Sequence, residues 1–216
     1  MDLKASQFLC SRICHDLIGP VGAVNAGMEL LSDMSVPDEE ALALVADSAT
    51  QVIRRLTYYR LAFGAGGANG PRALIEARKL ALDFMAGGKV TLDWPTEGGG
   101  TVDGPIGSGG VKLVMNLVLL AHDSLPRGGT VAVRMADMPD GVGVAVTASG
   151  IGASLKDGVA LAMNGDDPGE ALSAHTAVAF FAQQLALSLG RRIETIDAGD
   201  DEVRFAALLP RKTADD

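Results

Sequence analysis

The residues with the clearest chemical potential are His15 and Asp16, which lie near the start of the chain in the run Cys14-His15-Asp16-Leu17-Ile18-Gly19-Pro20. An imidazole is a nucleophile near neutral pH because one ring nitrogen carries a lone pair, and an adjacent carboxylate can fix which nitrogen holds the proton. This pair is suited to accepting and passing on a phosphoryl group. A single histidine on a helix is more often an ordinary surface residue, so the interpretation depends on its surroundings.

The segment around His15 has the periodicity of a helix that packs on other helices. Small or apolar residues recur at alternating steps of four and three, at Cys10, Cys14, Leu17, Val21, Val24, Met28 and Leu31. We expect a helix from about Leu3 to Asp33, with His15 turned about 100° away from the buried face and exposed. Cys10 and Cys14 are expected to be buried thiols. Pro20 removes a backbone donor and is expected to bend the helix just after the histidine.

A second helix with the same spacing is expected after Pro37. Its apolar positions are Leu42, Val45, Ala49, Val52, Leu56, Tyr59 and Phe63. Two such helices joined by a short connection form an antiparallel hairpin. Dimerisation into a four-helix bundle is the simplest way to bury both apolar faces, and coverage by the C-terminal region of the same chain is the alternative.

The antiparallel arrangement predicts which residues of the second helix lie level with His15. Counting back from the connection places Arg54, Arg55 and Tyr58 there, and Arg54 and Tyr58 share a helix face. A cationic and aromatic patch at this position could receive an acidic or phosphorylated partner surface. The alternative for each of these residues is an ordinary solvent-exposed side chain with no role in binding.

The pattern changes to mixed α/β after the glycine-rich segment 64–70, which we interpret as a linker. We expect helices at 71–85, 111–124 and 174–189, strands at 89–94, 130–135, 142–147, 191–196 and 203–209, and a loop at 97–110. The sequence therefore predicts an α+β protein with two domains. These are a helical hairpin at residues 1–66 and an α/β sandwich at 71–216.

Composition excludes several classes of function. The 216 residues are 48% hydrophobic and carry a formal net charge of −9, which argues against nucleic acid as the main partner. No run of about 20 apolar residues predicts a membrane span, and no leader pattern opens the chain. The two cysteines lie four residues apart, a poor spacing for a disulfide, so a reducing cytoplasm is the expected location.

Taken in order, these segments resemble the core of a sensor histidine kinase. The run from His15 to Pro20 is similar to the phosphoacceptor box of the dimerisation hairpin in that family. Residues 116–123 and 126–129 resemble its asparagine box, and residues 148–152 resemble its first glycine box. The resemblance implies an ATPase-like sandwich after the hairpin.

The departures from the kinase pattern concern nucleotide binding. Leu120 stands where kinases have an asparagine that helps to hold magnesium, and Ala148 stands where they have the aspartate that accepts the adenine amino group. Residues 172–177 do not supply a glycine-rich lid. We therefore expect a degenerate ATPase-like domain that binds no nucleotide or other cofactor.

A phosphoacceptor hairpin joined to such a domain, with the run from Val21 to Leu31, is similar to the ChpT family of histidine phosphotransferases. The resemblance implies a cytoplasmic homodimer, a phosphorelay intermediate without ATP-dependent kinase activity. Its partners would be receiver domains of a hybrid kinase and of response regulators that control the bacterial cell cycle or related programmes, with Mg²⁺ supplied by the receiver. His15 and Asp16 are the expected catalytic residues.

We assign Arg12, Ile18, Arg54 and Tyr58 to partner binding, and interpret His122 and His175 as structural or surface residues. Two other functions remain open at this point. One is a receiver-binding adaptor that carries no phosphate, and the other is an unusual ATP-dependent histidine kinase.

Overall fold

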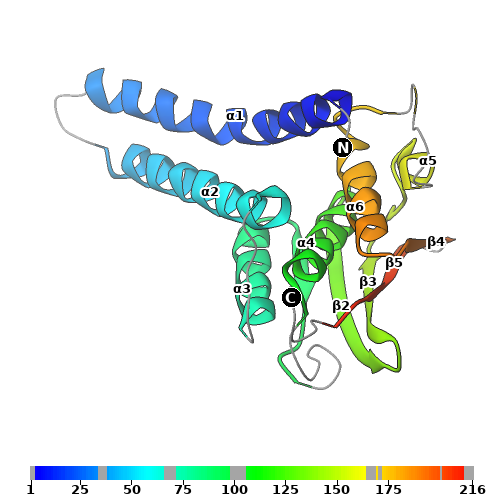
Figure 1. The fold of residues 1–216 in the computed structure, drawn as a ribbon. Helices are drawn as coiled ribbons and strands as arrows, with labels where there is room; N and C mark the ends of the chain where they lie inside the picture. The colour runs from blue at the N-terminus through cyan, green and yellow to red at the C-terminus, as the bar shows by residue number, and fades with distance from the viewer. Residues whose placement is uncertain are drawn as a thin grey trace.

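The computed structural model describes residues 3–33, 38–65, 72–97, 106–163, 169, 172–199 and 201–211. A long helical hairpin extends from an α/β domain (Figure 1). In chain order the elements are α1 (Leu3–Asp33), α2 (Glu39–Phe63), α3 (Ala73–Met85), β1 (Val90–Asp93), α4 (Ser108–Asp123), β2 (Gly129–Met138), β3 (Gly141–Ser149), α5 (Val159–Met163), α6 (Ala177–Ser188), β4 (Ile193–Gly199) and β5 (Glu202–Leu209). The predicted α+β class and the N-terminal hairpin are confirmed.

The two helices of the hairpin run antiparallel and pack along their length (Figure 1). α1 continues through Pro20 as one helix. α2 begins after Asp38, whose side chain accepts a hydrogen bond from the Glu40 N–H at 3.2 Å and so caps the helix. The helices approach closely at Gly27, where an added Cβ atom would lie 2.5 Å from Val45 Cγ2. Any larger residue at this crossing would force the Val45 side chain to shift.

The buried stripe of α1 is rotated from the stripe that the sequence spacing predicts. Ala5, Leu9 and Gly27 are its buried residues, and Asp16 is partly covered on the same side. Cys10 and Cys14 are exposed, so the prediction of buried thiols is wrong for the single chain. The predicted apolar face overlaps only in part with the packed face, because Leu17, Val24 and Leu31 are partly buried whereas Val21 and Met28 are exposed.

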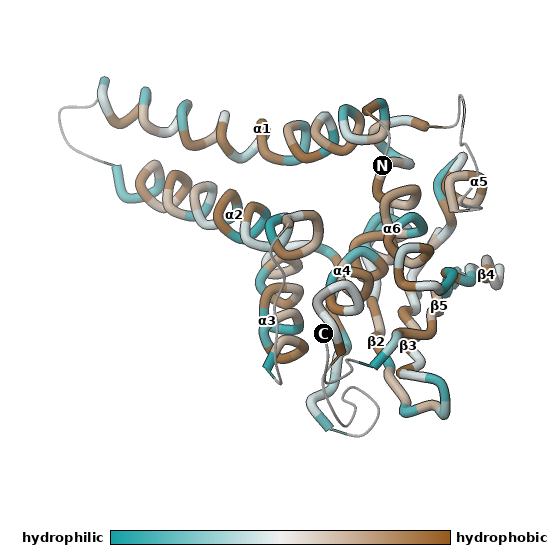
Figure 2. Tube along the Cα trace, viewed as in Figure 1, coloured by the Kyte–Doolittle hydropathy of each residue, from teal (hydrophilic) through white to brown (hydrophobic). Residues whose placement is uncertain are grey.

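The five strands form one mixed sheet in the order β1-β2-β3-β5-β4. β1 pairs parallel with β2, and the remaining pairs are antiparallel. α4 and α6 pack on each other and against the sheet (Figure 1), and both are strongly hydrophobic (Figure 2). Val133, Val146 and Phe205 are fully buried, and α4 is buried along most of its length. This layer arrangement is the predicted sandwich.

Most element predictions are confirmed, with shifted ends. α4 begins at Ser108 rather than Val111, α6 begins at Ala177 rather than Ala174, and β2 and β3 are longer than expected because their hairpin pairs continuously around Gly141. The short helix α5 was not predicted. Pro37, residues 66–70 of the linker and residues 98–105 of the expected loop lie outside the described residues.

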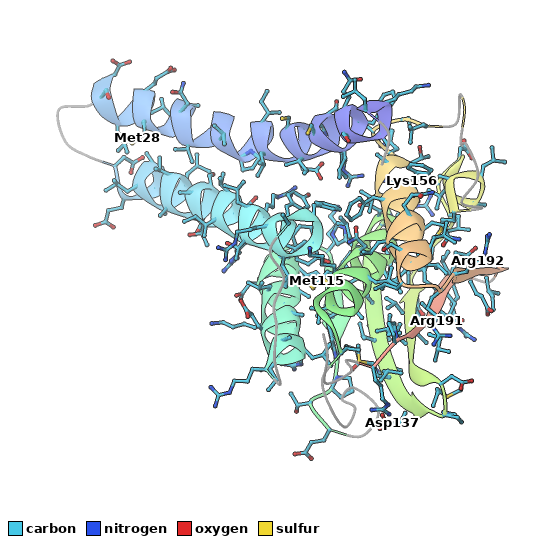
Figure 3. All side chains as sticks on the ribbon, in the orientation of Figure 1. Met28, Met115, Asp137, Lys156, Arg191 and Arg192 are labelled. Atoms are coloured by element: carbon cyan, nitrogen blue, oxygen red, sulfur yellow. The ribbon has the colours of Figure 1, made fainter. Side chains whose placement is uncertain are left out.

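Direct hydrogen bonds join the hairpin to the α/β domain. Tyr58 Oη in α2 donates to the Met115 carbonyl at 2.7 Å, and Asn116 Nδ2 donates to the Ala62 carbonyl at 3.0 Å. The Tyr58 ring also packs on Phe84, with centroids 4.4 Å apart. Figure 3 shows Met115 where α4 meets the hairpin, far from Met28 near the hairpin tip. Residues of α4 can therefore act directly on residues of the hairpin.

None of the helices in the described ranges is both long enough and apolar enough to cross a membrane.

Candidate functional site

His15 projects from α1 into solvent, as predicted. Its side chain is 81% exposed, and its Nδ1 atom lies 3.5 Å from Oδ1 of Asp16. The adjacent carboxylate favours a proton on Nδ1 and leaves Nε2 as the free ring nitrogen. An exposed imidazole held in this way can approach a reactive group on another molecule.

The carboxylate of Asp16 is held by residues of both hairpin helices. Its side chain is only 13% exposed. Oδ2 accepts hydrogen bonds from Arg12 Nε at 2.8 Å and from Tyr59 Oη at 2.6 Å. Arg55 Nη1 donates to the backbone carbonyl of Asp16 at 3.2 Å. These contacts fix the position of the group next to His15.

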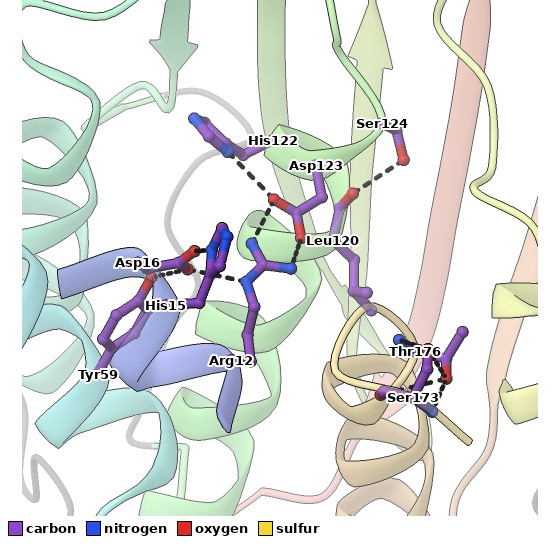
Figure 4. A network of polar contacts seen from close by, with 10 residues as sticks. All are labelled: Arg12, His15, Asp16, Tyr59, Leu120, His122, Asp123, Ser124, Ser173 and Thr176. Carbon is purple, nitrogen blue, oxygen red and sulfur yellow. Dashed lines mark hydrogen bonds and ion pairs between the residues drawn. The ribbon is translucent and has the colours of Figure 1, made fainter. Parts of the chain in front are cut away.

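A second carboxylate reaches the same arginine from the α/β domain. Arg12 Nη2 donates to Oδ1 of Asp123 at 3.0 Å, and Arg12 Nη1 lies 2.8 Å from Oδ2 in the same ion pair. Asp123 ends α4, and its Oδ1 atom is 3.5 Å from Nδ1 of His122. Figure 4 shows the resulting chain of contacts, from His15 through Asp16, Arg12 and Asp123 to His122. The α/β domain thereby helps to position the residue beside His15.

The two carboxylates are stabilised in their charged form. Burial by itself raises the pKa of Asp123, but its contacts with His122 and Arg12 outweigh burial and hold that pKa far below its ordinary value. Burial likewise opposes ionisation of Asp16, but hydrogen bonds from Tyr59 and Arg12 lower its pKa. Burial lowers the pKa of Arg12, yet its pairing with Asp123 and Asp16 raises it overall. The network therefore holds one cation between two anions.

These shifts predict acid destabilisation. The pKa values of Asp16 and Asp123 are lower in the folded chain, so their stabilising contribution is complete above the ordinary aspartate value of about 3.9 and is lost as the pH falls below it. We expect the free energy of unfolding, measured in urea at successive pH values, to decrease below about pH 4. Asp123→Asn should reduce this pH dependence, and an unchanged slope in that variant would contradict the assignment.

The comparisons with known proteins agree with this geometry. The family model described as the histidine phosphotransferase C-terminal domain matches residues 74–201, more than half of the chain. The chain belongs to this histidine phosphotransferase family. It is 34% identical over 206 residues to protein phosphotransferase ChpT of Brucella abortus (strain 2308), covering 95% of each chain.

A solved structure is also similar to this histidine phosphotransferase over nearly its whole length. A bacterial phosphotransferase determined at 1.7 Å is 31% identical, covers 96% of this chain and 97% of its own, and superposes with a TM-score of 0.80. The resemblance to the ChpT family is confirmed, and the chain has a phosphotransfer function. Its C-terminal domain has the α/β sandwich topology predicted after the hairpin.

The structure corrects two of the expected partner-binding residues of this phosphotransferase. Arg12 is 12% exposed and is engaged by Asp16 and Asp123, so it positions the site from within. Tyr58 is fully buried, because its ring packs on Phe84 of α3 and its hydroxyl donates to Met115 of α4. Ile18 is 72% exposed, and Arg54 is partly exposed, so these two remain candidates for contact with a partner.

Sequence reasoning missed Tyr59 and Asp123, whereas it placed Arg55 level with His15, where the structure has it. Tyr59 was interpreted as an apolar seam residue, although its hydroxyl needs a polar partner when the ring is buried. Asp123 is the acidic residue of an otherwise strongly apolar helix, which could have indicated a buried partner. Nothing local in the sequence connects it with Arg12, which lies 111 residues away.

Proposed function

We propose that this phosphotransferase relays a phosphoryl group through His15 between receiver domains of other proteins. The observation that carries the proposal is the exposure of His15 beside a buried and fully engaged Asp16. The exposed ring can enter the active site of a docked receiver, whereas the Asp16 carboxylate beside it is held by Arg12 and Tyr59. Positioning of this kind supplies much of the catalysis in phosphoryl transfer.

In the proposed step, the Nε2 lone pair of His15 attacks the phosphorus of an aspartyl phosphate on the receiver. The N–P bond forms as the acyl phosphate P–O bond breaks, and the receiver aspartate leaves as a carboxylate. The imidazole becomes positively charged with its proton on Nδ1, and Asp16 stabilises that charge. The reverse reaction passes the group to a second receiver, which brings its own Mg²⁺.

The same proposal assigns no nucleotide to the α/β domain. Leu120 and Ala148 support it, because both are buried in the hydrophobic core of the domain. Leucine offers no oxygen ligand to a hard cation, and alanine offers no acceptor for an adenine amino group. The domain instead supplies Asp123 to the network next to His15.

We also propose that the active species is a homodimer. Large apolar side chains remain exposed along the hairpin of a single chain, at Val21, Met28, Leu30, Leu42, Leu44, Ile53 and Leu56. Figure 2 shows hydrophobic residues recurring along both helices of the hairpin. A second copy with the same face would complete a four-helix bundle and bury them.

Light scattering first measures the molar mass of the protein in solution, which we expect to be that of a dimer. The deciding experiment then offers phosphate to this protein from two sources. One sample receives labelled ATP with Mg²⁺, and the other receives a receiver domain already phosphorylated on aspartate. We expect acid-labile, base-stable label on the protein only from the receiver. Label from ATP alone would show a kinase, and receiver binding without label would show an adaptor.

A further inference from the structure

One polar feature near the site has no part in the transfer chemistry. A cavity of about 130 Å³ lies between α2, the turn after α3 and the end of α4. Arg54, Arg55 and His122 line it, together with Gln51 and residues 84–88. Pockets for drug-sized ligands measure roughly 300–1,000 Å³, so this cavity has room for one small group rather than a nucleotide.

The charge of this cavity is opposite to that of the whole protein. None of its lining residues is acidic, although the chain carries a net charge of −9. Arg54 is partly buried and makes no hydrogen bond or ion pair with a described residue. Within the described ranges, Arg55 makes its one hydrogen bond to the neutral carbonyl of Asp16. Two partly desolvated guanidinium groups that form no ion pair with a described carboxylate favour an anion, and their planar forks match a carboxylate.

The nearby carboxylates do not neutralise the cavity. Asp16 and Asp123 both direct their oxygens to Arg12. The Nδ1 atom of His122 is buried and lies 3.5 Å from Asp123, and the side chain as a whole is 34% exposed and lines the cavity. Nε2 of His122 makes no hydrogen bond to a described residue, so it is available to a ligand.

We infer that Arg54, Arg55 and His122 form an anion subsite for a carboxylate carried by the protein that docks on His15. Arg55 connects the two sites, because it lines the cavity and holds the backbone of the residue next to His15. A partner that covers His15 can therefore place an acidic side chain in the cavity. The inference rests on the proposed function, and it assigns to the α/β domain, through His122, a direct part in recognising the partner.

The test compares Arg54→Gln with Arg60→Gln in the full-length protein. Arg60 is an exposed arginine of the same helix that does not line the cavity, so its replacement removes the same charge elsewhere. We expect Arg54→Gln to weaken the affinity for the phosphodonor receiver by about ten-fold or more, since an engaged interfacial charge is lost. Arg60→Gln should change the affinity by less than about two-fold. Equal effects of the two variants would overturn the inference.

A second measurement uses small anions and does not depend on the receiver. Acetate and inorganic phosphate are titrated into the protein while the ring signals of His122 are followed by NMR. Saturable shifts in the wild type that are lost in Arg54→Gln and kept in Arg60→Gln would support the subsite, and shifts without saturation would overturn it. A third outcome is that phosphate shifts the His122 signals saturably while Arg54→Gln leaves the affinity for the receiver unchanged. The cavity would then bind free phosphate, and the assignment to a partner carboxylate would be overturned.

The two proposals fail in different ways. Absence of phosphoryl transfer from the receiver to the wild type would remove the relay function, while the anion titration would still decide the subsite. Normal transfer with equal behaviour of the two arginine variants would retain the relay and remove the subsite.

Discussion

Replacing His15 with alanine is expected to abolish phosphoryl acceptance, because the proposed N–P bond forms on the ring nitrogen that this substitution removes. The protein should remain folded, since the side chain is 81% exposed and exposed substitutions usually change the free energy of unfolding by less than about 0.5 kcal/mol. The measurement is the amount of label taken from a phosphorylated receiver, with circular dichroism and urea unfolding as checks on the fold.

His175→Ala is the matched control for this experiment. His175 is the other exposed histidine of the chain, lies two residues before α6 begins at Ala177, and is not among the residues that contact Asp16 in the described structure. The control should accept label at the wild-type rate. Full labelling of His15→Ala would place the phosphoacceptor elsewhere, and loss of label in His175→Ala would point to that residue instead.

The helical hairpin is predictable from sequence because its periodicity is local. Alternating steps of four and three residues correctly indicated α1 and α2, and the count from their connection correctly placed Arg55 beside Asp16. The rotation of α1 about its axis is not local. It depends on what α2, α4 and α6 offer as packing partners, and these put Asp16 on the covered side and left Cys14 exposed.

The candidate site was predictable only in part, for the same reason. His15 and Asp16 are adjacent, and their pattern indicates their chemistry. The sequence does not distinguish an arginine that binds a partner protein from one that pairs with a carboxylate of its own chain. Only the fold shows that Arg12 pairs with Asp123. The sequence therefore predicted the exposure of His15 beside Asp16 correctly, but it assigned Arg12 to the wrong surface.

Arg12→Met is the substitution expected to cost the most stability, because it removes the guanidinium that pairs with the largely buried carboxylates of both Asp16 and Asp123. Removing one partner from a buried ion pair typically costs about 3–5 kcal/mol of unfolding free energy. Asp123→Asn should cost less, about 1–3 kcal/mol, since Arg12 keeps its pairing with Asp16 and asparagine can still accept a hydrogen bond. Urea unfolding near neutral pH measures both values.

Arg134→Met provides the contrast, because Arg134 pairs with Asp93 on the surface, where both side chains are about half exposed. Such pairs contribute about 0–1 kcal/mol, so this variant should unfold almost like the wild type. Equal stabilities of Arg12→Met and Arg134→Met would show that the buried network does not hold the hairpin to the domain.

The double variant Arg12→Met/Asp123→Asn separates stability from chemistry. It removes the cation and one of the two anions, so its loss of stability should be smaller than the sum of the single losses. Its rate of transfer should still be as low as that of Arg12→Met, since Asp16 has lost its hydrogen bond from Arg12 in both proteins. A transfer rate that instead followed stability through the three variants would mean that Arg12 acts only by holding the fold together. A rate that followed the loss of the Arg12–Asp16 contact would identify Arg12 as the residue through which the α/β domain positions His15 for transfer.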